Sequence, residues 1–268
     1  MIEKLLGLTE QELKAEIKQP KSLRIYPDRD SKDGAGIAIL WAPFDHINRE
    51  AKLAIVGVTP GPTQALLSYR AVQSADAKGQ DPQASLAEIK AESSFRGHII
   101  EHNLKSLLEH SGVAESADIE NIDNLWTKEA YKVHFTSTIR YPTFFNGDLY
   151  NNQIDSLTHP ELKRYVETYL AEELSALPMS ALIVALGSEG PRIVRHAAKI
   201  GGIDRKRVVE LPHPSGSASG AVRGFLSERR TKSIRPCRCM LCDRSRIPAG
   251  WNLAKRFAIH DNIHRSAS

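Results

Sequence analysis

The chain has few cysteines and no long hydrophobic run, and both absences narrow what it can be. It contains three cysteines in 268 residues, all between positions 237 and 242, too clustered for the disulfide framework of a small secreted protein. The chain contains no run of about 18 apolar residues, which is the length that would predict a membrane span. The start, Met1-Ile2-Glu3-Lys4, lacks the basic and apolar regions of a signal peptide. We therefore expect a soluble, cytoplasmic protein.

The composition is otherwise that of a globular protein, with an uneven distribution of charge. Hydrophobic residues make up 41% of the chain and charged residues 25%, which is enough for a sizeable core. Residues 221–268 contain eleven Lys and Arg against three Asp and Glu, a local net charge of +8, so residues 1–220 carry −4. A basic end favours a polyanionic partner, because phosphate binding releases counterions. A solvated basic tail is the alternative.

Alternating strand and helix patterns between Lys52 and Leu226 predict an α/β fold with helices on both faces of a parallel sheet. Upstream, Thr9 and Glu12 form a capping-box pattern that starts a short helix. The pattern of Gly34–Trp41 predicts a strand, which we expect to belong to a hairpin that leads to the strand at Lys52. We expect an N-terminal helix and hairpin packed on the core (residues 1–50), an α/β core (residues 51–230) and a basic, cysteine-containing C-terminal appendage (residues 231–268).

Two polar stretches interrupt this alternation. Ser74–Ser94 reads as a loop or insertion with a small helix, and Phe144–Thr158 reads as a turn-rich excursion.

Two short segments carry most of the functional information. The apolar run Leu53–Val56 stops abruptly in Gly57-Val58-Thr59-Pro60-Gly61-Pro62, which predicts a buried strand, a tight loop and then a helix over Thr63–Val72. Much later, the apolar strand Val208–Leu211 is followed by the loop Pro212-His213-Pro214-Ser215-Gly216-Ser217. Because open α/β sheets bind ligands at the carboxyl ends of their strands, the two loops are expected to face one site.

In this order, the two loops resemble the signature loops of the uracil-DNA glycosylase superfamily. Further segments are similar to that family: Phe95-Arg96-Gly97 with the helix Ile99–His110, the middle strand within Tyr131–Pro142, the helix His159–Leu177, the strand Ala181–Gly187, and Trp41–Asp45, which looks like less-studied bacterial branches. The resemblance covers about residues 52–226. It implies a three-layer α/β/α fold around a central, mostly parallel four-stranded sheet, and an enzyme that flips out a nucleotide and hydrolyses its N-glycosidic bond.

The resemblance assigns His213 and Thr59 to catalysis. His213 matches the histidine that donates a hydrogen bond to the departing base, and preorganised donors of this kind are worth on the order of 10²–10³ in rate. Thr59 falls where relatives carry Asp, Glu or Asn to activate water. A threonine can orient water but cannot act as a carboxylate base. The alternative is that Thr59 only caps the turn and that Gln64, or an acid from residues 74–94, positions the water.

The resemblance also implies contacts to the base and to DNA. Phe95 stacks on the flipped base, and Arg140 is a candidate phosphate contact. Ser217 occupies the position of an apolar wedge in many relatives, so opening the duplex needs another residue, such as Arg223, or an easily unpaired substrate. The full set of implied substrate and DNA contacts is Gly57, Val58, Pro60, Gly61, Gln64, Phe95, Ser137, Arg140, Pro214, Ser215, Gly216, Ser217 and Arg223.

Two of these positions depart from the family pattern in a way that bears on the substrate. Ser137 replaces the asparagine that reads uracil, and a lone hydroxyl cannot supply the bidentate pattern of an amide. Gly61 stands where the strictest uracil enzymes carry a tyrosine that blocks C5 of the base. Both departures favour a C5-modified cytosine, such as the glucosylated hydroxymethylcytosine of phage DNA, and thus a role in antiviral defence.

The cysteine cluster offers a possible metal site. Cys237, Cys239 and Cys242 have C-x-C-x₂-C spacing, with His260 and His264 downstream, so three Cys and one His could bind a structural zinc. The spacing does not match the iron–sulfur relatives. Free thiols are the alternative.

The sequence therefore predicts a monofunctional DNA glycosylase, since neither signature loop contains a lysine for Schiff-base chemistry. We expect a monomer that acts on double- or single-stranded DNA and needs no cofactor for catalysis. The alternatives are an ordinary uracil-DNA glycosylase of base-excision repair, a catalytically inactive DNA-binding relative, and a non-DNA enzyme on the same fold, against which the basic tail argues.

Overall fold

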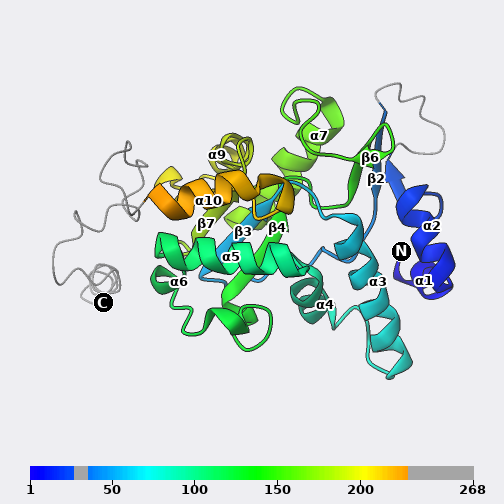
Figure 1. The fold of residues 1–268 in the computed structure, drawn as a ribbon. Helices are drawn as coiled ribbons and strands as arrows, with labels where there is room; N and C mark the ends of the chain where they lie inside the picture. The colour runs from blue at the N-terminus through cyan, green and yellow to red at the C-terminus, as the bar shows by residue number, and fades with distance from the viewer. Residues whose placement is uncertain (27–35, 229–268) are drawn as a thin grey trace, which may run out of the picture.

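The computed structural model of the chain describes residues 1–26 and 36–228. Its centre is a four-stranded parallel sheet in the order β4-β3-β7-β8 (Figure 1). The strands are β3 (Leu53–Gly57), β4 (Val133–Ser137), β7 (Leu182–Leu186) and β8 (Val208–Leu211). The chain passes from β3 to β4 on one side and then crosses to β7 on the other side. Such a reversal opens a crevice at the carboxyl ends of the strands.

Alternate residues of β3 serve two separate cores, one on each face of the sheet. Ala54 and Val56 belong to a large cluster with α3 (Pro62–Ala77) and α9 (Gly190–Ile200). Leu53 and Ile55 belong to a second cluster with α5 (His98–Ser111), and α10 (Ser219–Glu228) covers the same face. The period of two is the side-chain alternation of a strand that is buried on both faces. The prediction of an α/β fold with helices flanking a parallel four-stranded sheet is confirmed.

A second sheet, entirely antiparallel, has the order β1-β2-β5-β6. It contains β1 (Arg24–Tyr26), β2 (Ile37–Leu40), β5 (Thr143–Phe145) and β6 (Asp148–Leu149). The strand predicted within Gly34–Trp41 is present as β2, and it pairs antiparallel with β1 inside residues 1–50, as expected for the N-terminal hairpin. It does not pair with the strand at Lys52. Both edges of β3 are already paired, with β4 and β7, so β2 pairs with β1 and β5 instead. The N-terminal segment thereby packs on the core through residues 143–149.

The helices follow the expected local signals with some changes of length. The capping box between Thr9 and Glu12 is present and begins α2 (Glu10–Lys18), which follows α1 (Ile2–Leu6). The prediction that residues 74–94 form a loop with a small helix is partly wrong, because α3 continues to Ala77 and α4 (Leu86–Ser93) occupies much of the rest. Residues 74–94 are polar, as loops usually are, but they are also good helix formers, and their helix propensity decides the structure.

Two further segments refine the predictions. Residues 160–175 are helical throughout, as expected, through α7 (Pro160–Tyr165), a π-helical stretch (Val166–Leu170) and α8 (Ala171–Ser175). The excursion at residues 144–158 begins as the β5–β6 hairpin, with Asn146 and Gly147 both at positive φ in its turn. A short helix, α6 (Val113–Ser116), follows α5. In the described ranges, no helix combines the length and apolar character that a membrane span requires.

Candidate functional site

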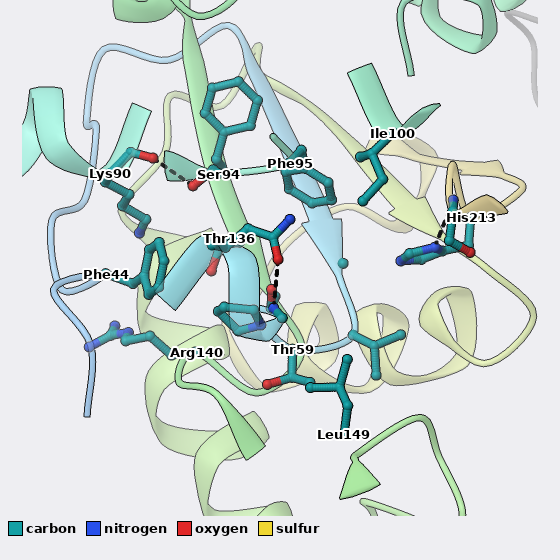
Figure 2. Close-up of a pocket in the computed structure, with 18 residues that line it drawn as sticks. Phe44, Thr59, Lys90, Ser94, Phe95, Ile100, Thr136, Arg140, Leu149 and His213 are labelled. Atoms are coloured by element: carbon teal, nitrogen blue, oxygen red, sulfur yellow. Dashed lines mark hydrogen bonds between the residues drawn. The ribbon is translucent and has the colours of Figure 1, made fainter. Parts of the chain in front are cut away.

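A cavity of about 170 Å³ lies at the carboxyl ends of β3, β4 and β8 (Figure 2). It brings together eleven of the predicted site residues: Gly57, Val58, Thr59, Pro60, Gly61, Gln64, Phe95, Ser137, Arg140, His213 and Ser215. The loops after β3 and β8 are about 155 residues apart in sequence. They converge, as the sequence predicted, because parallel strands place their carboxyl ends at the same edge of the sheet. In the described part of the chain, no Asp or Glu lines this cavity.

The hydroxyl of Thr59 is committed to the protein's own backbone. Thr59 Oγ1 donates to the carbonyl of Tyr141 at 2.7 Å and accepts from the amide of Thr143 at 3.1 Å. These bonds fasten the loop after β3 to the start of β5. Because its proton is used, Thr59 is not placed to take a proton from water, and the geometry favours the alternative in which it holds the turn.

Gln64 likewise serves as a connector. Its Oε1 accepts from the amide of Gly61 at 2.9 Å, and its Nε2 donates to the carbonyl of Arg96 at 3.1 Å. A Cβ at Gly61 would lie 2.6 Å from Gln64 Oε1, so a side chain there would displace this bridge. Gln64 therefore ties the two loops together and has little freedom to position water. The space beside Gly61 is therefore already taken by Gln64, and Leu149 Cδ2 lies 3.8 Å from the same position.

Phe95 is an aromatic wall held in a strained conformation. Its φ is +51°, which is costly for an aromatic residue and is retained only where the surroundings enforce it. Its ring lies 5.9 Å from that of Phe135, which stacks on Trp126, and Trp126 Nε1 donates to the carbonyl of Ser94 at 2.7 Å. Gly57 allows this approach, since a Cβ there would lie 3.1 Å from the Phe95 ring.

His213 lies at one end of the cavity, with its imidazole pointing inward (Figure 2). The backbone amide of Ser215 donates to its Nδ1 at 3.3 Å. Burial lowers the pKa of His213 below the ordinary value of 6.5, which favours the neutral ring. A neutral ring that accepts at Nδ1 carries its proton on Nε2, so His213 presents a donor. Asn103 of α5 fixes the loop by donating to the carbonyl of Pro214 at 2.9 Å.

The opposite end contains a buried charged cluster that the sequence analysis did not find. Lys90 and Arg140 both line the cavity there (Figure 2). Both form ion pairs with Glu173, which is 0% exposed. His134 Nε2 and Glu173 Oε2 are 2.8 Å apart. Burial lowers the pKa of His134 to about 4, and the ammonium of Lys90 adds to this effect. Glu173, among these cations, has a pKa well below its usual range.

This cluster changes the expectation for Arg140. Its side chain is 7% exposed and ion-paired with Glu173, so it faces the cavity and not the outer surface where a DNA phosphate would pass. Phe44, Thr136 and Leu149 also line the cavity without having been predicted. Phe44 lies in the Trp41–Asp45 segment, and Thr136 is the neighbour of Ser137 at the end of β4, so these two positions had a signal in the sequence. Long-range packing brings Leu149 to the cavity, and no local motif marks it.

Four predicted contacts lie outside the cavity lining. Pro214 is buried within the loop, Gly216 and Ser217 are exposed in the 3-10 turn that precedes α10, and Arg223 is exposed on that helix. Ser217 Oγ lies 2.9 Å from Ser215 Oγ. The cysteines at 237, 239 and 242 lie outside the described residues. Among the residues that are described, no group of three or more His, Cys, Asp or Glu could hold a metal.

Comparisons with known proteins give little information on function. No protein-family model matches the chain, and no solved structure matches it. It is similar to the uncharacterized protein YoxB of Bacillus subtilis (strain 168), with 26% identity over 192 residues, which cover 70% of this chain and 75% of the relative.

Proposed function

We propose that the protein is a monofunctional DNA glycosylase that flips a modified pyrimidine out of DNA, hydrolyses its N-glycosidic bond and leaves an abasic site. The observation that carries the proposal is the fixed tautomer of His213, with Nδ1 accepting from Ser215 and Nε2–H directed into a cavity. Phe95, held at positive φ, provides an aromatic face in the same cavity. An extruded base needs both a stacking surface and a donor for its developing charge.

The reaction calls for stabilisation of a leaving group. As the glycosidic bond breaks, the sugar becomes oxocarbenium-like and the base departs as an anion. A neutral imidazole with its proton on Nε2 donates a hydrogen bond to that charge, and a donor already in place costs no reorganisation at the moment of reaction. His213 performs this step in the proposal. Phe95 holds the plane of the base while the bond lengthens.

Water activation plays a smaller part in this mechanism. No carboxylate among the described residues lines the cavity, and the proton of Thr59 is already donated to Tyr141. Water then adds to a sugar cation that has largely formed, and a strong base is not required. Lys90 is at the end of the cavity away from His213 (Figure 2), and its side-chain nitrogen is already held by the carbonyl of His46 at 2.7 Å and by Glu173 at 3.6 Å, so it is not free to attack a sugar carbon as an amine. The enzyme therefore releases the base by hydrolysis.

The lining favours a substrate other than plain uracil. Ser137 offers a hydroxyl where a uracil reader needs an amide, and Gly61 places no side chain of its own in the cavity. In this proposal the substrate is a cytosine enlarged at C5, such as glucosylated hydroxymethylcytosine of phage DNA, and the role is one in defence. An ordinary uracil-DNA glycosylase is the competing assignment for the same site.

A DNA-binding relative without catalysis is the second candidate. The bonded Thr59 hydroxyl and the lack of a carboxylate in the described lining favour it. It would retain the stacking surface of Phe95 and the basic C-terminal segment but would release no base.

One experiment tests these assignments. Oligonucleotides carrying uracil, hypoxanthine, hydroxymethylcytosine or glucosylated hydroxymethylcytosine are incubated with the full chain and scored for abasic sites. We expect release from a C5-modified cytosine, and a loss of at least about 10²-fold in His213→Ala with DNA affinity little changed. Equal activity in His213→Ala would remove this residue from the mechanism. Binding without release from any of the four DNAs would favour the non-catalytic candidate.

A further inference from the structure

We propose that Ile99 opens double-stranded DNA, by entering the base stack at the place that the extruded nucleotide leaves. The inference rests on the proposed glycosylase function and deepens it, because it names duplex DNA as the substrate and the residue that separates its bases. Extruding a nucleotide costs pairing and stacking energy. Apolar side chains that insert between base steps offset this cost in proteins that distort DNA.

Ile99 is an exposed aliphatic side chain at the rim of the cavity. It is the second residue of α5, and 54% of its surface is exposed. The next residue, Ile100, lines the cavity (Figure 2). Ile99 itself does not line it, so the two neighbours lie on the inner and the outer side of the same wall.

Ile99 also lies against the loop that carries His213. A Cβ placed on Gly216 would be 3.7 Å from Ile99 Cδ1 and 3.8 Å from its Cγ2, which is ordinary van der Waals contact. One helical turn further along α5, Asn103 donates to the carbonyl of Pro214 at 2.9 Å. Contacts at two points of the loop therefore fix Ile99 beside the proposed catalytic histidine.

The helix behind Ile99 is firmly held. Leu104 and Leu107, on the inner face of α5, are 0% exposed and belong to the core on that side of the sheet. At the start of the helix, the carboxylate of Glu101 accepts from the amide of Gly97 at 3.0 Å. A side chain that separates stacked bases needs such a support, because a yielding segment would be pushed aside.

The same segment provides the aromatic wall of the cavity. Phe95 lies four residues before Ile99, and Gly97, at a φ of +123°, turns the chain between them. One short segment therefore holds an aromatic side chain for the extruded base and an aliphatic side chain for the gap that the base leaves. The loop of His213 offers no comparable side chain, since residues 215–217 are Ser-Gly-Ser.

Exposure alone would not single out Ile99, because single apolar residues are common on protein surfaces. Ile200 is 49% exposed at the end of α9, but α9 runs from the carboxyl ends of the strands back toward their amino ends, so Ile200 is remote from the cavity. Leu149 is 38% exposed and lines the cavity, so it faces the base. Ile99 combines exposure, contact with the catalytic loop and an outward position.

Ile99→Ala is the test variant, and Ile200→Ala is its matched control. Alanine removes the apolar volume and favours a helix more than isoleucine does, so both variants should fold. Ile200→Ala makes the same change at a similarly exposed helical position away from the cavity. Ile99→Leu is a conservative variant that keeps an apolar side chain of the same size.

The first measurement is single-turnover excision of each of the four target bases of the oligonucleotide assay, placed once in a single strand and once in a duplex. A single strand has no base pair to open, so it does not need Ile99. We expect the ratio of duplex to single-strand excision to fall by about tenfold or more in Ile99→Ala, because alanine lacks most of the apolar surface that fills the stack. The ratio should change little in Ile99→Leu and in Ile200→Ala.

The second measurement detects opening of the duplex without base release. The same target bases are placed on a 2′-fluoroarabino sugar, which resists release, next to a 2-aminopurine whose fluorescence rises when it loses its stacking neighbour. We expect the wild type, Ile99→Leu and Ile200→Ala to raise the fluorescence. The rise should be smaller with Ile99→Ala at saturating protein.

The outcomes separate this inference from the proposed function. An unchanged ratio in Ile99→Ala, or an equal loss in Ile200→Ala, overturns the inference and leaves the glycosylase assignment intact. A wild type that releases bases from single strands alone has the same consequence. A fluorescence rise that Ile99→Ala loses and Ile99→Leu keeps supports the inference even when no base is released. The absence of both release and a fluorescence rise overturns the inference and the proposed function together.

Discussion

The backbone amide of Ser215 donates to Nδ1 of His213 at 3.3 Å, two residues along the same loop. The bond fixes the proton of the neutral imidazole on Nε2, the nitrogen that faces the cavity. Burial supports this state by lowering the pKa of His213. The donor that the proposed mechanism requires is therefore set by a local loop interaction, without a charged partner.

Ser215→Pro tests this relationship directly. The φ of Ser215 is −66°, a value that proline adopts without strain, so the change removes the N–H while preserving the backbone conformation. With Nδ1 unsatisfied, the ring is free to change tautomer, and we expect base excision to fall by about tenfold or more at unchanged DNA affinity. Single-turnover kinetics and equilibrium binding measure the two quantities.

Ser215→Ala is the control for that variant. It retains the backbone N–H and removes only the side-chain contact with Ser217. We expect activity near that of the wild type. A loss as large as that of Ser215→Pro would assign the effect to the hydroxyl and remove the tautomer argument.

Gly57→Ala tests the aromatic wall. A Cβ at this position would lie 3.1 Å from the Phe95 ring and 3.5 Å from Ser137 Oγ, so the Phe95 ring must give way by a few tenths of an ångström. Because Phe95 is already held at positive φ, it has little freedom to adjust. We expect the rate of base excision to drop by about tenfold or more, because the base is misplaced and not because a catalytic group has been removed.

Gly220→Ala provides the comparison for that substitution. Gly220 lies in α10, and a Cβ there meets nothing within 4 Å. Alanine in a helix is more stable than glycine by up to about 1 kcal/mol. We expect a slightly raised melting temperature with unchanged excision. Equal excision by the two alanine variants would show that the position of Phe95 does not limit the reaction.

His134 gives the protein a predictable sensitivity to acid. Its pKa is lowered by burial to about 4 from an ordinary value of 6.5. Between these values the unfolded chain binds a proton that the folded protein does not, so stability falls as the pH falls from 6.5 toward 4. Urea unfolding at pH 7 and at pH 4.5 measures the loss. We expect the loss to be smaller in His134→Gln, by on the order of 2 kcal/mol. An identical loss in this variant would place the acid sensitivity elsewhere.

The sequence predicted the parts of the fold that depend on local patterns. The apolar runs of β3, β7 and β8, the capping box at Thr9 and the helix α5 all follow from periodicity and turn residues. The pairing of β2 with β5 could not be predicted in this way. It depends on whether β3 has a free edge, which is a property of the whole sheet.

The site was predictable to a similar extent. The two loops converge because parallel strands share a carboxyl edge, and a sequence shows this through order and spacing alone. Lys90, Glu173 and Arg140 meet only through packing of α4 and α8 against β4 and the residues that follow it. Periodicity identifies these positions as helical or near a strand, but it cannot show that their charges compensate one another in the interior.

The basic C-terminal segment is expected to carry much of the DNA affinity. Residues 221–268 hold a net charge of +8. Ending the chain after Thr231 removes most of these cations, so affinity should fall and its dependence on salt concentration should flatten. Titrations of one duplex at several salt concentrations measure the slope. An unchanged slope would show that these charges do not contact phosphate.

Ser137→Asn addresses the identity of the base. Ser137 is 7% exposed at the end of β4 and lines the cavity, so an amide there meets the base edge directly. Asparagine can donate and accept at once, as uracil requires, whereas serine offers one hydroxyl. We expect Ser137→Asn to shift the ratio of uracil to C5-modified cytosine excision toward uracil by about tenfold, or 1.4 kcal/mol of transition-state preference. Ser137→Ala, which supplies no amide, should leave uracil disfavoured. A wild type that already prefers uracil by tenfold would instead identify the protein as an ordinary uracil-repair enzyme.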